Sequence, residues 1–104
     1  MVTLPSTPKA FYRGTAPTAT TTVYTVPSAG LAVVTNLVAS NPGNESSSIT
    51  VRLAGVPLLS SVGIAPHGGL LTLDVRQVIA AGDTIDIQGT GALAHVHISG
   101  AEIT

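Results

Sequence analysis

The chain has 104 residues with four basic and five acidic side chains, which give a formal net charge of −1. This length accommodates one domain with one core, and four separated cations do not make the basic stripe with which proteins bind nucleic acids. No apolar run approaches the roughly 18 residues of a membrane-spanning helix, and a chain without cysteine has neither disulfides nor thiolate metal sites.

Charged residues make up only 9% of the sequence, against about 25% in ordinary soluble domains. A free monomer normally stays apart from its neighbours through surface charge, whereas this chain uses Ser, Thr and Gly. Two interpretations remain open. Either the surface is neutral and hydroxyl-rich, as in many secreted β-proteins, or much of it is covered by other subunits.

Residues 1–20 differ from the rest of the chain. Pro5, Pro8 and Pro17 each remove a backbone donor, and the segment has no amphipathic period. The sequence therefore predicts an extended N-terminal arm over residues 1–20, followed by a β-sandwich domain over residues 21–104. The start of the chain also lacks the basic and apolar stretches of a signal peptide, so we expect synthesis in the cytoplasm.

The predicted arm contains Phe11, Tyr12 and Arg13. Aromatic residues and arginine are the types that anchor protein interfaces, so we expect these three residues to bind a partner. In the alternative interpretation, Phe11 and Tyr12 pack on their own domain as a short edge strand. The two interpretations are compatible if that strand lies at a subunit boundary.

From residue 22 onward, strand signals recur about every ten residues, as in a sandwich or small barrel. The predicted strands are residues 22–26, 31–40, 48–53, 58–64, 70–75, 83–88 and 93–103. One helical turn is predicted over residues 77–82. Since no helices are available to carry parallel crossovers, we expect an all-β, antiparallel sandwich of about eight strands, immunoglobulin-like or jelly-roll-like.

The stretch over residues 31–41, which contains the second of these strands, is long and apolar at odd and even positions alike. Its apolar residues are Leu31, Val33 and Leu37 on one side, and Val34 and Val38 on the other. A strand with one side in water alternates more cleanly. We therefore expect this strand at the centre of the sheet with material over both faces, part of it from other subunits.

The last two strands are predicted to form a hairpin. A four-residue turn pairs Ile85 with Val96, because a one-residue slip would turn one apolar set outward. Asp86 then lies opposite His95, and a turn shifted by one residue places it opposite His97. We expect these three polar residues on the outward face, as a cross-strand Asp–His pair or as a histidine cluster at a subunit interface. In the second case acidification should weaken the assembly by crowding cationic imidazoles.

The polar residues form neither a metal-binding nor a catalytic signature. His95, His97 and Asp86 fall one ligand short of a tetrahedral zinc site. The serines lack the base, the orienting group and the Gly-x-Ser-x-Gly motif of a hydrolase. We predict no metal, no cofactor and no enzymatic activity.

Several short segments follow one another along the chain in a characteristic series. They are Val-Tyr-Thr-Val-Pro at 23–27, Val-Val-Thr-Asn-Leu at 33–37, a turn begun by Asn41, Ile-Thr-Val-Arg-Leu at 49–53, Gln-Val-Ile-Ala-Ala-Gly-Asp-Thr-Ile at 77–85, and Val-His-Ile-Ser-Gly at 96–100. This series, over about residues 11–103, resembles small β-sandwich structural proteins of tailed bacteriophages, which occur as capsid decoration proteins or as modules of tail appendages. The resemblance implies a place in the virion, homo-oligomers that are often trimers, and a major capsid or tail protein as partner.

These observations lead us to expect a non-enzymatic capsid decoration, or cementing, protein. It would bind the outer surface of the assembled shell as a homo-oligomer, a trimer by the resemblance, and stabilise it. A tail or fibre-associated virion protein is the alternative. A carbohydrate-binding sandwich is a third interpretation, but sugar sites stack their ligands on aromatic rings, and this chain has three aromatic residues and no tryptophan.

Overall fold

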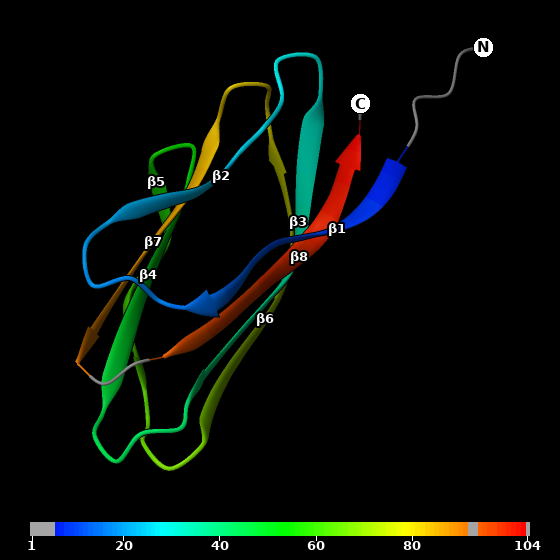
Figure 1. Ribbon diagram of the computed structural model, residues 1–104. Coiled ribbons are helices and arrows are strands. Elements are labelled where there is room, and N and C mark those ends of the chain that lie inside the picture. Colours follow the sequence, from blue (N-terminus) through cyan, green and yellow to red (C-terminus); the bar gives the residue numbers. More distant parts are fainter. Residues whose placement is uncertain (1–5, 92–93, 104) are drawn as a thin grey trace.

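The computed structural model describes residues 6–91 and 94–103, which form eight strands (Figure 1). The strands are β1 (Ser6–Thr15), β2 (Thr21–Thr25), β3 (Leu31–Asn41), β4 (Ser47–Leu53), β5 (Val56–Ile64), β6 (Gly69–Ile79), β7 (Thr84–Gly91) and β8 (His95–Ile103). All pairings are antiparallel and no helix occurs in the described residues, which confirms the predicted all-β sandwich. The helical turn predicted over residues 77–82 is wrong, because β6 continues to Ile79 and the chain then turns at Gly82, where φ is 83°.

The strands form two four-stranded sheets. Sheet A has the order β1-β8-β3-β6 and sheet B the order β2-β7-β4-β5; Figure 1 shows them as two layers. Between described strands that follow one another in sequence, only β4 and β5 pair as a hairpin, and the other connections cross from one sheet to the other. This is the strand order of a jelly roll. Of the two sandwich types left open by the sequence, the jelly roll is therefore the one observed.

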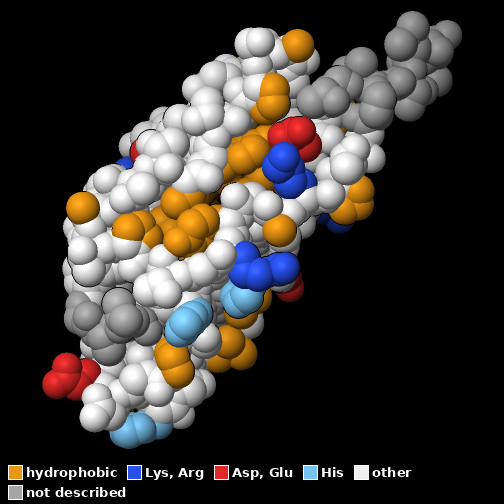
Figure 2. All heavy atoms as spheres, in the orientation of Figure 1, with side chains coloured by type: hydrophobic (Ala, Val, Ile, Leu, Met, Phe, Trp, Pro, Cys, Tyr) orange, Lys and Arg blue, Asp and Glu red, His pale blue; other side chains and the backbone are white. Residues whose placement is uncertain are grey.

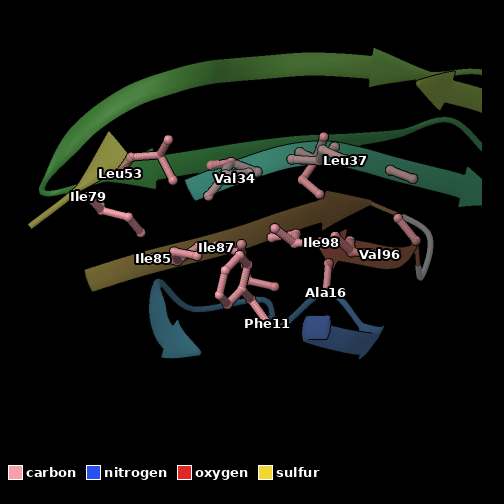
Figure 3. Packing of buried hydrophobic residues seen from close by; sticks show 14 of the residues in the cluster. Phe11, Ala16, Val34, Leu37, Leu53, Ile79, Ile85, Ile87, Val96 and Ile98 are labelled. Carbon is pink, nitrogen blue, oxygen red and sulfur yellow. The ribbon is translucent and has the colours of Figure 1, made fainter. Parts of the chain in front are cut away.

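Inward side chains of both sheets meet in one core (Figure 3). Because successive residues of a strand point to opposite faces, Ile85 and Ile87 of β7 enter the core from sheet B. Val96 and Ile98 of β8 enter it from sheet A, and none of the four is more than 1% exposed. The core is almost entirely aliphatic and is completed by the ring of Phe11.

Strand β3 lies between β8 and β6 at the centre of sheet A, as predicted. The predicted assignment of its two sides is wrong, because a bulge shifts the register between Val34 and Asn36. Val34 and Leu37 therefore both point into the core, while Val33 and Val38 are half-buried on the outer side. In the single chain, the outer side of β3 is partly exposed to solvent.

The turn between β3 and β4 is held by Asn41, which is completely buried. Its Nδ2 donates hydrogen bonds to the carbonyl oxygens of Glu45 at 2.7 Å and Ile64 at 3.2 Å, and its Oδ1 accepts one from the Gly43 amide at 3.0 Å. A buried amide side chain is tolerated only when it is hydrogen-bonded in this way. Asn41 thus begins a turn, as the sequence predicts, and also ties that turn to the end of β5.

A separate N-terminal arm over residues 1–20 is not confirmed. From Ser6 to Thr15 the chain forms β1, which pairs with β8 along its whole length. Phe11 lies at a bulge in this strand and is 6% exposed. Pro8 fits there because an edge strand leaves part of its backbone donors unpaired. The edge-strand interpretation therefore describes β1, and residues 1–5 lie outside the described part of the chain.

The packing of β8 against β3 and β1 can be tested at Gly100. A Cβ added there would lie 1.9 Å from the carbonyl oxygen of Val33 and 2.9 Å from Phe11 Cε2. Gly100→Ala should therefore lower the free energy of unfolding by about 3 kcal/mol, the upper part of the usual overpacking range. The measurement is urea denaturation followed by circular dichroism.

The matched control is Gly63→Ala in β5, where an added Cβ meets nothing within 4 Å. This substitution should change the free energy of unfolding by less than about 0.5 kcal/mol. Equal losses in the two variants would contradict the close approach of β8 to β3.

Candidate interaction face

The outer face of sheet A carries exposed apolar side chains. Leu70 and Val78, both on the edge strand β6, are 64% and 65% exposed. The strand registers place four apolar residues side by side, one from each strand: Pro8, Ala101, Val33 and Val78. We call these four residues the apolar row. Exposed apolar surface that is contiguous, and not scattered, is typical of interaction sites.

The same face carries a basic cluster. Arg13 and His97 lie opposite one another on β1 and β8, and Arg13 Nε donates a hydrogen bond to His97 Nδ1 at 3.0 Å. His95 follows on the same side of β8, and all three side chains are exposed. Figure 2 shows pale-blue histidine side chains beside a blue one, on a surface with few charges. The hydrogen bond requires an unprotonated Nδ1, so protonation of His97 would replace it by a contact between two cations.

The structure brings together residues that the sequence treats as two separate sites. Arg13 and His97 are 84 residues apart and become neighbours only because β1 pairs with β8. Phe11, in contrast, lies in the core and cannot anchor a partner. Tyr12 is half-buried, and its hydroxyl donates to the Thr15 carbonyl oxygen at 2.6 Å. Of the three residues predicted to bind a partner, Arg13 alone has an exposed side chain.

The predicted proximity of Asp86 to the histidines is wrong. β7 lies in sheet B and β8 in sheet A, so the two strands do not pair. Their apolar residues do share the core, but they enter it from opposite sides. Asp86 lies opposite Arg52 on the outer face of sheet B, where its Oδ1 accepts a hydrogen bond from Thr22 Oγ1 at 2.6 Å.

Polar side chains on the outer face of sheet B hydrogen-bond to one another. Thr20 Oγ1 donates to Gln88 Oε1 at 3.1 Å, and the hydroxyls of Ser48 and Thr90 are also hydrogen-bonded. The two outer faces of the sandwich therefore differ in chemistry. Sheet A presents the apolar row and the basic cluster, and the outer face of sheet B presents hydroxyl, amide and charged groups, several of which hydrogen-bond to one another. The candidate interaction face is the outer face of sheet A.

A second cluster, which no local pattern in the sequence predicts, joins the two sheets. Tyr24 of β2 donates its hydroxyl hydrogen to Glu102 Oε2 of β8, and its ring lies 4.6 Å from the ring of Phe11, centroid to centroid. Lys9 Nζ lies 3.5 Å from Glu102 Oε2 and 5.7 Å from the centroid of the Tyr24 ring. Lys9–Glu102 is the only ion pair among the described residues. Because β2 belongs to sheet B, these contacts help to close the sandwich at its β1–β2 side.

The described residues contain neither a pocket nor a group of three or more His, Cys, Asp or Glu side chains that could hold a metal ion. Within the same residues, no helix is long and apolar enough to cross a membrane. No protein-family model matches the sequence, and no curated protein matches it.

The role of Phe11 as a core residue can be tested by substitution. Phe11→Ala should lower the free energy of unfolding by about 3 to 5 kcal/mol, because the ring is buried and contacts Tyr24. Arg13→Ala, two residues along the same strand, removes an exposed side chain and should cost less than about 1 kcal/mol. Thermal and urea denaturation measure both effects. A Phe11→Ala chain as stable as the wild type would contradict the placement of Phe11 in the core.

The Tyr24–Glu102 contact makes stability depend on pH in the alkaline range. Burial, together with the hydrogen bond and charge of Glu102, raises the pKa of Tyr24. Since its pKa in the unfolded chain is lower, about 10, this stabilisation is complete below pH 10 and is lost as the pH rises above that value.

Tyr24→Phe has no ionisable hydroxyl and lacks the hydrogen bond. At pH 8 it should be less stable than the wild type by about 1 kcal/mol, and the difference should shrink by about pH 11. Guanidinium denaturation at the two pH values measures it. A difference that stays constant would show that Tyr24 does not titrate differently in the folded and unfolded chains.

Proposed function

We propose that this chain is a non-enzymatic structural protein of a tailed-bacteriophage virion, a decoration protein that binds the outer surface of the assembled capsid and stabilises it. The observation that carries the proposal is the apolar row, which crosses the outer face of sheet A in a chain with only 9% charged residues. Such a surface is suited to lie against another protein. The jelly-roll strand order adds support, because viral capsid domains commonly use it, although a fold alone does not fix a function.

The two outer faces suggest how the protein would sit on a shell. The outer face of sheet A would contact the major capsid protein, with the apolar row at the centre of the contact. Arg13, His95 and His97 would supply polar contacts at its margin, as in interfaces with an apolar core and a polar rim. The hydroxyl-rich outer face of sheet B would remain in water.

Stabilisation of the shell then follows from mass action. A protein that binds the assembled state and not the free subunits shifts the equilibrium toward assembly, by an amount that grows with its concentration relative to Kd. A homo-oligomer would bind several capsid subunits at once. Simultaneous binding raises the overall affinity without any new kind of contact.

The interaction face can be tested by placing a charge in the apolar row. Ala101→Lys should reduce binding to capsids by tenfold or more, about the effect of losing 1.4 kcal/mol, because the ammonium group would be held against an apolar contact. Ala81→Lys, in the exposed turn after β6, is the matched control and should bind normally. Co-sedimentation with capsids stripped of the protein measures both. Equal binding by the two variants would rule out this face.

The copy number in purified particles separates decoration from a tail or fibre role. A decoration protein should be present in numbers comparable to the major shell protein, because its sites repeat with the shell lattice. Gel densitometry against the shell protein measures this ratio. A ratio that is a small fraction of the shell protein would favour the tail or fibre alternative.

A further inference from the structure

Sheet A ends on one side at β6, which pairs with β3 alone. The other sheet edges among the described strands have features that hinder pairing with a further strand. β1 contains Pro8 and a bulge at Phe11, β2 has five residues, and β5 contains Pro57 and two register shifts. β6 has eleven residues with neither proline nor lysine, and its one irregularity is the register shift at Val75 and Arg76, the two residues that lie opposite Thr35 of β3. It is the edge most open to another strand.

The inward side chains of β6 are incompletely covered. Leu71, Leu73 and Val75 pack against the core but are only half-buried. Leu58 and Leu59 of β5, the edge strand of the other sheet, also pack against the core and are also only half-buried. The sandwich is therefore partly open along its β5–β6 side. A strand added to β6 would cover apolar surface there as well as satisfy backbone groups.

The charges of β6 are self-complementary. Val75 faces the core, so its neighbours Asp74 and Arg76 face outward, and both are exposed. Neither makes an ion pair within the described residues; Asp74 accepts only a long hydrogen bond, 3.4 Å, from Asn36 Nδ2. In an antiparallel pair of two β6 strands centred on Val75, Asp74 of each copy lies opposite Arg76 of the other. Opposite charges directly across a strand pair stabilise it.

The neighbouring registers are disfavoured by the same residues. A shift of one residue would turn the apolar side chains of one copy outward. The two nearest registers that keep them inward place Asp74 opposite Asp74 or Arg76 opposite Arg76, and like charges in that position destabilise the pair. The sequence of β6 thus selects one register of self-pairing.

We propose that two copies of this chain associate through β6, antiparallel about a two-fold axis at Val75, so that their A sheets join into one continuous sheet. Main-chain hydrogen bonds would supply the affinity, as in other strand additions to a sheet edge. The Asp74–Arg76 pairs would fix the register, and the half-buried side chains of β6 would be covered. The inference does not rest on the proposed function, since it needs no capsid.

Charge reversal tests the pairing. The wild-type chain should associate reversibly with rising concentration in sedimentation equilibrium. Asp74→Arg and Arg76→Asp should each raise the dissociation constant by about tenfold or more, because each replaces two attractive pairs by two repulsive ones. The double variant Asp74→Arg/Arg76→Asp should restore association to within a few-fold of wild type. Glu45→Arg, an equal change of charge in an exposed turn, should leave it unchanged.

A cross-link tests the register, against a background free of cysteine. Asp74→Cys and Arg76→Cys chains, mixed under mild oxidation, should form a disulfide with each other faster than either forms one with itself, because opposed residues have the Cα separation that a disulfide requires. The proposal is overturned if the wild type stays monomeric at all concentrations, or if the single charge reversals leave its dissociation constant unchanged. It is also overturned if the double reversal fails to restore association, or if two identical cysteine variants cross-link as fast as the mixed pair. None of these results bears on the binding of Ala101→Lys to capsids, which tests the proposed function separately.

Discussion

One core of aliphatic side chains, shared by the two sheets, is the interaction on which the rest of the structure depends. Leu37 and Ile98 of sheet A belong to the same buried cluster as Ile49 and Ile87 of sheet B. No disulfide supports this core, because the chain has no cysteine, so apolar burial at about 25 cal/mol per Å² is the main stabilising contribution. Since most connections cross between the sheets, a strand cannot leave its place without disturbing both. The side chains on the two outer faces can differ in chemistry because they take no part in the packing of the core.

The sequence predicts the strands well and their partners poorly. Alternation of apolar and polar residues is local, so the inward positions of β7 and β8, such as Ile85 and Val96, follow directly from it. The choice of sheet for each strand is not local. A hairpin and a crossing connection bury the same side chains, and only the second places Asp86 and His95 on opposite sides of the molecule. The fold class could therefore be predicted, whereas the grouping of polar residues into sites could not.

Bulges explain most of the remaining differences. The bulge in β3 reverses its alternation, so that Val34 and Leu37 face the same way although they are three residues apart. The bulge at Phe11 lets the ring enter the core from β1, a strand whose sequence contains proline and therefore predicts an extended arm. The contact between Lys9 and Glu102 joins the two ends of the described chain, and no pattern within a short window contains it. Such contacts follow from the topology and can be inferred only when the order of the strands in each sheet is known.

The free edge and the outer face of sheet A would act together. In the pairing proposed for β6, Val78 at the end of one apolar row lies opposite Thr72 of the second copy. Within its own sheet, Thr72 lies opposite Val38, which lies opposite His97, and His97 in turn lies opposite Arg13. Each apolar row would then run on into the basic cluster of the other copy. The joined face would have two apolar rows and two Arg–His pairs related by the two-fold axis, and two equivalent contacts bind a repeating surface more tightly than one. The edge would in this way strengthen binding by the face, although the backbone of β6 would itself contact only another copy of the chain.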